Sequence, residues 1–168
     1  SFDNLHPKYR ANSNVIIYSS NKSNSTYAPQ HNNFDLYEIN KLTSKIIQLT
    51  NTPLVNEIQP QPKNKFSYYY LSNINGVNNQ YKKATDSTIS HIDTVIHYRK
   101  YQTPYQLSNY DRNIEEIDIH PETEKFITLY KKNGKYQFLT GDLTKQTIFE
   151  NNDVKTRFAS YKSQRSSV

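Results

Sequence analysis

The sequence contains no cysteine, no methionine, no tryptophan and only three glycines. Without cysteine the chain can form neither a disulfide framework nor a thiolate-ligated metal site. The three glycines are scattered, which excludes a glycine-rich loop for phosphate binding, and no Gly-x-Ser-x-Gly motif offers a serine nucleophile. No apolar run approaches the roughly 20 residues that a membrane-spanning helix requires. The sequence thus lacks the usual signatures of thiol chemistry, phosphate-loop nucleotide binding and serine hydrolysis.

Hydrophobic residues make up only 34% of the 168 positions, a proportion that by itself would suggest disorder. The aromatic content argues against disorder, because the chain has 15 tyrosines and 7 phenylalanines. Aromatic and β-branched residues suit the half-buried surface of a β-sheet. Short strand-like runs separated by Asn, Ser, Asp and Gly fill the sequence, and none keeps a helical period for three turns. The sequence therefore predicts an ordered, all-β protein.

The formal net charge of +6 permits binding to nucleic acid or to an acidic surface. Lysine and arginine are nevertheless scattered through the turns, with aspartate and glutamate between them. The concentrated group, Lys155, Arg157, Lys162 and Arg165, lies in a serine-rich stretch. We interpret residues 151–168 as a polar basic tail or linker and predict no nucleic-acid partner. Because even the first position lacks methionine, we expect a processed product or an excised piece of a longer protein.

One segment of the sequence returns after 58 residues (106 − 48 = 58). Residues 48–51 (Gln-Leu-Thr-Asn) recur as residues 106–109 (Gln-Leu-Ser-Asn), and a Glu-Ile pair follows each copy, at 57–58 and 116–117. Periods of this size are typical of propellers and solenoids, in which each unit buries its apolar face against the next. The repeat therefore predicts one structural unit used several times.

Each repeat has the pattern of four short antiparallel strands, which is the anatomy of a propeller blade. We predict blade 1 at residues 1–50, blade 2 at 51–109 with an insertion at about 85–103, and blade 3 at 110–150. About three blades cannot close a ring, so we expect an incomplete propeller. A β-sandwich with similar hairpins is the alternative. The buried second strands should be the apolar runs that begin at Val15, Phe66 and Phe126.

Residues 7–22 (Pro-Lys-Tyr-Arg-Ala-Asn-Ser-Asn-Val-Ile-Ile-Tyr-Ser-Ser-Asn-Lys) resemble the core of TolB-type β-propeller repeats. Residues 34–39 (Phe-Asp-Leu-Tyr-Glu-Ile), followed by Gln-Leu-Thr at 48–50, resemble the second half of that repeat. The family's Pro-Asp-Gly turn is replaced here by Ala-Asn-Ser-Asn at 11–14. The richness in Asn, Lys, Tyr and Ile, with residues 70–79, is similar to the long propeller proteins of the Bacteroidetes cell envelope. The resemblance implies a TolB-like propeller located in the periplasm or cell envelope.

Polar residues beside the expected first strands are candidates to line a central channel. Histidines before proline, at similar places in two repeats, suggest one end of it, and no two histidines have the helical i,i+4 spacing of a metal motif. One interpretation is a cation bound in the channel. We favour water-bathed polar side chains and predict no cofactor. The candidates are His6, Glu57, Glu116, Asp118 and His120.

The insertion at 85–103 is the candidate partner-binding element, because an insertion within a repeat maps to a loop on one face, often the binding face. Its apolar residues alternate with polar ones, so we expect an ordered extra hairpin beside blade 2. The candidate contact residues are Ile89, His91, Ile92, Val95 and His97.

With repeated blades and no catalytic constellation, we predict a protein that is not an enzyme. We expect a scaffold for protein–protein interaction in the bacterial cell envelope, associated with the envelope or the outer membrane. Its partner would be a protein or the remaining blades of a larger protein. Two alternatives stay open. The first is the propeller domain of a larger serine hydrolase or peptidase, and the second is a glycan-binding module that uses surface tyrosines.

Overall fold

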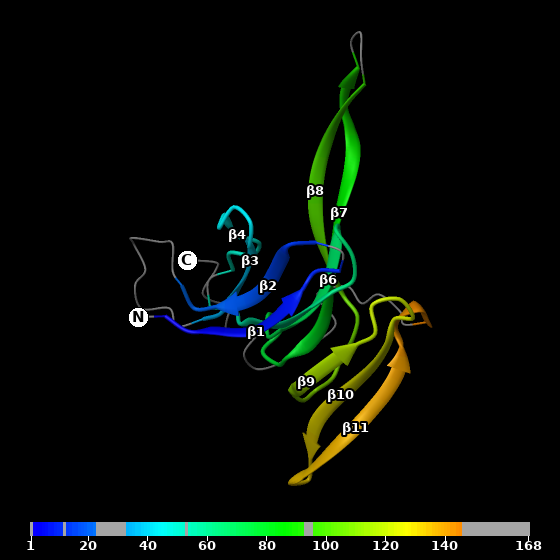
Figure 1. The fold of residues 1–168 in the computed structure, drawn as a ribbon. Coiled ribbons are helices and arrows are strands. Elements are labelled where there is room, and N and C mark those ends of the chain that lie inside the picture. Colours follow the sequence, from blue (N-terminus) through cyan, green and yellow to red (C-terminus); the bar gives the residue numbers. More distant parts are fainter. Residues whose placement is uncertain (1, 12, 23–32, 53, 93–95, 146–168) are drawn as a thin grey trace, which may run out of the picture.

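The computed structural model describes residues 2–11, 13–22, 33–52, 54–92 and 96–145. Within them the chain forms three antiparallel β-sheets, none closed on itself (Figure 1). The same residues contain one 3-10 turn, Leu143–Lys145, and no α-helix. No helix in this part of the chain has the length and apolarity needed to cross a membrane. The prediction of an all-β protein is confirmed.

The first two sheets are four-stranded meanders, in which neighbouring strands are consecutive in sequence. The described residues supply three consecutive strands to the third sheet. The fourth strand expected there, at 146–149, and the expected tail at 151–168 lie outside the described residues. The strands are β1 (Asn4–Tyr9), β2 (Val15–Ser20), β3 (Asp35–Asn40), β4 (Ile46–Gln48), β5 (Glu57–Pro62), β6 (Ser67–Ser72), β7 (Asn79–Ile92), β8 (Ile96–Gln106), β9 (Ile114–Ile119), β10 (Lys125–Lys132) and β11 (Lys135–Asp142).

The turn between β10 and β11 is determined by two residues, Asn133 and Gly134. Both have positive φ angles, 52° and 76°, as a two-residue type I′ turn requires. Lys132 and Lys135 pair on either side of the turn. The Asn-Gly sequence therefore sets the register of this hairpin.

The central strand of the fold is β6, whose six residues are all buried. Successive side chains of a strand point to opposite faces of its sheet. Tyr68 and Tyr70 accordingly belong to one apolar cluster, with the first sheet, and Tyr69 and Leu71 to another, with the third sheet. The second sheet is thus packed on both faces. The partners are Ile17 and Leu36 in the first cluster and Ile114, Ile117, Ile119 and Phe126 in the second.

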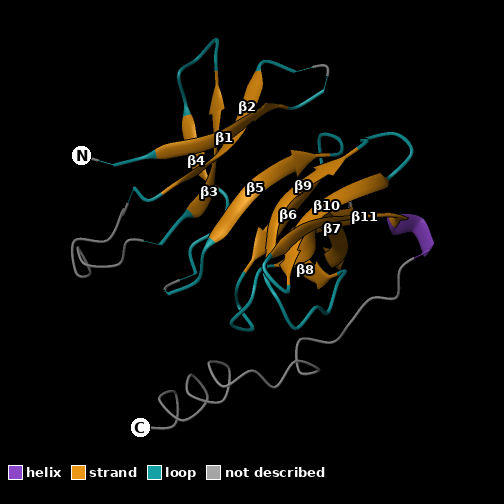
Figure 2. Cartoon of the chain, turned by 90° about the horizontal axis from the view of Figure 1, so that it is seen from below, coloured by secondary structure: helices purple, strands orange, loops and turns teal. Residues whose placement is uncertain are grey.

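The first strands of the three sheets lie in a row, with β5 between β1 and β9 (Figure 2). β1 and β5 share the same irregularity, since their pairing shifts after Leu5 and after Ile58. The next residues, His6 and Gln59, have φ angles of 54° and 53°. Such left-handed residues are typical of β-bulges, which bend a strand and re-aim its side chains.

The 58-residue sequence repeat is also a structural repeat. The backbone N–H of Leu36 donates to Thr50 Oγ1 at 2.8 Å, and that of Gln80 donates to Ser108 Oγ at 2.8 Å. Thr50 and Ser108 are equivalent in sequence (108 − 50 = 58). In each case a hydroxyl from the segment after the fourth strand bonds the third strand of the same sheet.

The predicted burial of the second strands holds for Phe126, which is 5% exposed, and is wrong for Phe66, which is 53% exposed. β6 begins one residue after Phe66, so the ring lies at the entrance to the strand and outside the core. It contacts the side chain of Lys65, whose ammonium group is 5.4 Å from the ring centroid.

Candidate functional site

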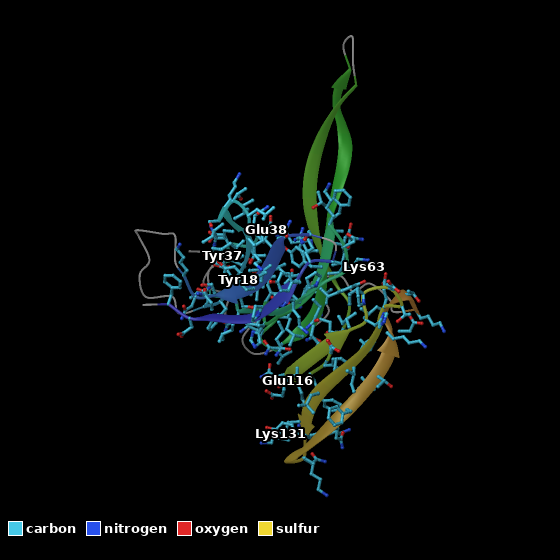
Figure 3. The ribbon with its side chains drawn as sticks, in the orientation of Figure 1. Tyr18, Tyr37, Glu38, Lys63, Glu116 and Lys131 are labelled. Carbon is cyan, nitrogen blue, oxygen red and sulfur yellow. The ribbon has the colours of Figure 1, made fainter. Side chains whose placement is uncertain are left out.

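A shallow groove of about 190 Å³ runs between the first strands of the three sheets. Its lining includes His6 and Lys8 from β1 and Glu116 from β9, which is labelled in Figure 3. Asp118 joins it through an ion pair with Lys8, with 3.6 Å between Nζ and Oδ1. Three of the five predicted channel residues, His6, Glu116 and Asp118, therefore meet at this groove.

The electrostatics of the groove are mild. Neighbouring atoms displace water from the imidazole of His6 and lower its pKa from the ordinary 6.5, and the negative charge of Glu116 opposes this effect. The ion pair of Lys8 with Asp118 is exposed, so it contributes little to stability. In the described parts of the chain, no group of three or more His, Asp or Glu side chains could hold a metal ion.

Two glutamines that sequence reasoning missed make the strongest contacts of the groove. Gln59 Nε2 donates to the carbonyl oxygen of Glu115 at 2.7 Å, and Gln59 Oε1 accepts from the Ile117 N–H at 2.9 Å. Gln61 Nε2 donates to the Ile117 carbonyl oxygen at 3.2 Å. These amides tie β5 to β9 where no backbone ladder does. The signal was the Gln-Pro-Gln-Pro run at 59–62, in which amides alternate with prolines that lack an N–H.

The other two predicted channel residues, Glu57 and His120, are not part of the groove. His120 follows β9, where its Nδ1 accepts from the Thr123 N–H at 3.3 Å, so it is not equivalent to His6 within β1. Glu57 begins β5 and lines a separate pocket between the first and second sheets. Position along the chain could not distinguish these places, because the bulges in β1 and β5 change which side chains share a face.

The pocket between the first and second sheets has a volume of about 280 Å³. Glu57 is only 6% exposed, and its Oε2 is buried with no hydrogen-bond partner among the described residues. Burial raises the pKa of Glu57 to about 7 and outweighs the hydroxyls of Thr50 and Thr52 and the charge of Lys83, which lower it. Other lining residues are Thr50, Thr52, Tyr70, Ser72, Tyr81 and Lys83.

Two further ionisable side chains lie beside Glu57, and both are satisfied. Asp35 Oδ1 accepts from the Thr52 N–H at 3.1 Å, and Lys83 Nζ donates to the Leu49 carbonyl oxygen at 2.7 Å. Burial raises the pKa of Asp35 and lowers that of Lys83. With all three groups charged, two carboxylates face one ammonium, so this set carries one net negative charge.

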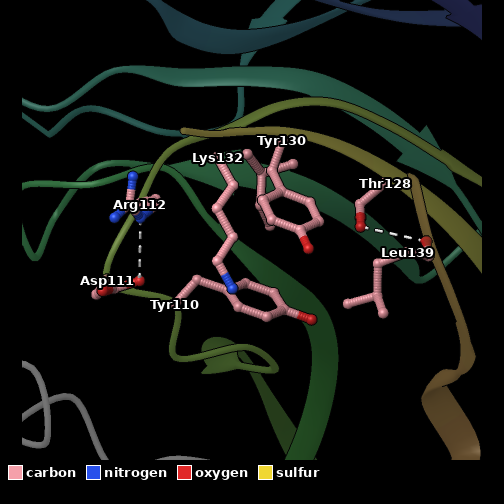
Figure 4. Close-up of a pocket in the computed structure, with 8 residues that line it drawn as sticks. Tyr110, Asp111, Arg112, Thr128, Tyr130, Lys132 and Leu139 are labelled. Carbon is pink, nitrogen blue, oxygen red and sulfur yellow. Dashed lines mark hydrogen bonds and ion pairs between the residues drawn. The ribbon is translucent and has the colours of Figure 1, made fainter. Parts of the chain in front are cut away.

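A second pocket, of about 250 Å³, lies at the corresponding place between the second and third sheets (Figure 4). The backbone establishes the correspondence. The N–H of Glu57 donates to the Phe34 carbonyl oxygen at 2.7 Å, and the N–H of Ile114 donates to the Asn78 carbonyl oxygen at 3.0 Å. Each acceptor immediately precedes the third strand of its sheet. Glu57 and Ile114 are therefore equivalent residues, the first of β5 and of β9.

The two pockets differ in chemistry at their equivalent positions. Asn79 Oδ1 accepts from the Tyr110 N–H at 2.8 Å, as Asp35 Oδ1 accepts from Thr52. The charged side chains of the second pocket, such as Lys132, are exposed at its rim. By these bonds and by the strand registers, the equivalent pairs are Glu57 with Ile114, Asp35 with Asn79, Tyr81 with Leu139, and Lys83 with Gly141.

Residues 85–92 and 96–103 continue the last two strands of the second sheet. β7 and β8 pair as far as Ile92 opposite Ile96, and the hairpin extends well beyond the other strands (Figure 1). The expected extra hairpin is thus a lengthening of existing strands. Of the predicted contact residues, Val95 lies outside the described residues, and Ile89, His91, Ile92 and His97 lie in the paired part.

The chain matches no protein-family model, and no curated protein is significantly similar to it.

Proposed function

We propose that the three sheets are consecutive blades of an incomplete, TolB-like β-propeller that serves as a non-catalytic scaffold for protein–protein interaction in the bacterial cell envelope. The observation that carries this proposal is the position of β6, whose alternating side chains fill two separate clusters. A middle blade needs neighbours on both faces. Each sheet of a β-sandwich, in contrast, packs on one face.

The exposed apolar side chains on the outer face of the third sheet favour the binding of a partner protein or of further blades there. Ile127 is equivalent to Tyr69 (127 − 69 = 58), which is buried against the third sheet. Ile127 itself is 40% exposed, and Phe138 and Tyr136, which pair with Leu129 and Lys131 further along the same strand, are 72% and 63% exposed. Grouped apolar side chains on a protein surface mark interaction sites. The strand position that Tyr69 buries between the second and third sheets is thus exposed in the third sheet, where Ile127 occupies it.

The extension of β7 and β8 offers the scaffold a projecting surface, and its removal tests the proposal. Thr85 and Gln102 are direct pairing partners, so an Asn-Gly turn in place of residues 86–101 should close the shortened hairpin. We expect this variant to keep the β-sheet circular dichroism and cooperative melting of the wild type. Cross-linking of purified protein to bacterial envelope proteins, followed by mass spectrometry, should lose specific partners.

Three outcomes contradict the proposal. If the deletion leaves the cross-linking pattern unchanged, the hairpin does not bind a partner. If the purified wild type hydrolyses model esters or peptides, the protein is an enzyme and the non-catalytic role is wrong. A specific glycan-array signal, abolished by substitution of exposed tyrosines such as Tyr136, favours the glycan-binding alternative.

A further inference from the structure

The fold does not need a carboxylate at the position of Glu57. Its equivalent, Ile114, is 1% exposed and packs in the apolar cluster between the second and third sheets. An apolar residue at this position therefore satisfies the architecture. A buried carboxylate oxygen without a donor is costly, because burial removes its hydration and returns no hydrogen bond. The first pocket carries this cost and the second does not, which indicates a use for Glu57 beyond folding.

The surroundings of Glu57 favour a cationic partner that carries N–H donors. Its Oε2 lacks a hydrogen-bond donor, and the set of Asp35, Glu57 and Lys83 is short of one positive charge. Lys83 acts on Glu57 through its charge, and the hydrogen bond of its ammonium group goes to the Leu49 carbonyl oxygen. No ion pair within 4.0 Å joins Lys83 to Glu57 in the part of the chain that the structure describes.

Two aromatic rings line the same pocket. Tyr70 and Tyr81 have ring centroids 5.8 Å apart and planes tilted by 32°. The face of an aromatic ring attracts ammonium and guanidinium groups, most strongly where water is displaced. In the second pocket the equivalent residues are Thr128 and Leu139, which offer no ring. The second pocket has rings of its own, Tyr110 and Tyr130, and an exposed carboxylate, Asp111, but none of them stands at a position equivalent to Glu57, Tyr70 or Tyr81. The buried carboxylate beside two rings is therefore particular to the first pocket.

We propose that the pocket between the first and second sheets binds one cationic nitrogen group, an alkylammonium or a guanidinium, with Glu57 as its counter-ion. The group donates a hydrogen bond to Glu57 Oε2 and lies against Tyr70 and Tyr81. The volume of about 280 Å³ suits one small molecule or one side chain. A free amine and a lysine or arginine of a protein share this chemistry. The inference does not depend on the propeller assignment.

The pH dependence of binding follows from the groups that face Glu57. Burial raises the pKa of each neighbouring tyrosine, so these stay neutral at neutral pH. Burial lowers the pKa of Lys83, and the negative charge of Glu57 opposes this effect. Glu57, with a pKa of about 7, is then the group that titrates. The facing groups are Asp35 from β3, Tyr68 and Tyr70 from β6, and Tyr81 and Lys83 from β7.

The experiment is a titration of ¹⁵N-labelled protein with ethylguanidinium chloride and, separately, propylammonium chloride, followed by NMR. At pH 8 we expect saturable shifts near Tyr70 and Tyr81. Affinity should fall roughly tenfold at pH 6, where most of the Glu57 carboxyl is protonated. Ethylurea, a neutral isostere of ethylguanidinium, should not bind.

Variants complete the test. Glu57→Ile introduces the residue found at the equivalent position of the second pocket and should abolish binding. Glu57→Gln should also abolish binding, and it replaces the isoleucine variant in the test if that variant does not fold. Glu116→Gln, a matched change in the groove, should bind like the wild type. Absence of saturable binding to folded wild type at pH 8, or unchanged affinity in Glu57→Gln, overturns the proposal. Binding of acetylated Ala-Ala-Arg-Ala-Ala amide as well indicates a protein side chain as the source, and binding of the free cations alone indicates a small amine.

Discussion

Gln59 of β5 and Ile117 of β9 are hydrogen-bonded as neighbouring strands of one sheet would be, although they belong to different sheets. The Gln59 Oε1 accepts the Ile117 N–H at 2.9 Å, and its Nε2 donates to the Glu115 carbonyl oxygen at 2.7 Å. A side-chain amide provides both bonds because the backbone of Gln59 is left-handed, with φ 53°, at a break in strand pairing. The second and third sheets are thereby joined along their first strands.

Truncation of this link should destabilise the protein. Gln59→Ala leaves the N–H of the buried Ile117 without its acceptor, which costs about 1–3 kcal/mol. Alanine keeps the same backbone demand for positive φ, so the change isolates the side chain. Urea unfolding should show the loss. The control, Gln137→Ala, changes an exposed glutamine of β11 and should cost less than about 0.5 kcal/mol. Equal losses in the two variants would contradict the bridging role.

Phe66, which immediately precedes β6, and Phe126, the second residue of β10, should respond differently to truncation. Phe126→Ala removes a ring from the cluster between the second and third sheets and should cost about 3–5 kcal/mol. Phe66→Ala removes an exposed ring and should cost less than about 1 kcal/mol. Thermal unfolding of both variants measures the difference. Comparable losses would place Phe66 in a core and refute the strand boundary at Ser67.

Stability should rise as the pH falls from 8 to 5 because of Glu57. Burial raises its folded-state pKa to about 7, above the ordinary 4.5. The stability is highest below pH 4.5 and falls between pH 4.5 and 7, because over that range Glu57 is ionised in the unfolded chain and protonated in the folded one. Unfolding in urea at both pH values should show a loss on the order of 2–3 kcal/mol at pH 8, relative to Glu57→Gln. A parallel pH dependence in wild type and variant would show that Glu57 is not buried as a carboxyl.

Local sequence patterns were sufficient to predict some features of the structure and not others. The Asn133-Gly134 turn could be predicted, because positive φ angles restrict a turn to few residues. The 58-residue repeat was visible since Thr50 and Ser108 make the same hydrogen bond. The groove was only partly predictable, because the bulge at Gln59 re-aims side chains and no sequence rule places it. The burial of Glu57 also escaped sequence analysis, since only the alignment of two pockets reveals Ile114 as its equivalent.

The stacking of three sheets is tested most directly by nuclear Overhauser effects from the tyrosine rings of β6 in isotopically labelled protein. Tyr68 and Tyr70 should show contacts to the methyl groups of Ile17 and Leu36 in the first sheet, and Tyr69 should show contacts to the third sheet, near Ile117. The two sets should not overlap, because successive residues of β6 face opposite sides. Contacts to a neighbouring sheet from only one of the two sets, with the other set exposed to solvent as in a two-layer sandwich, would contradict the stacked arrangement.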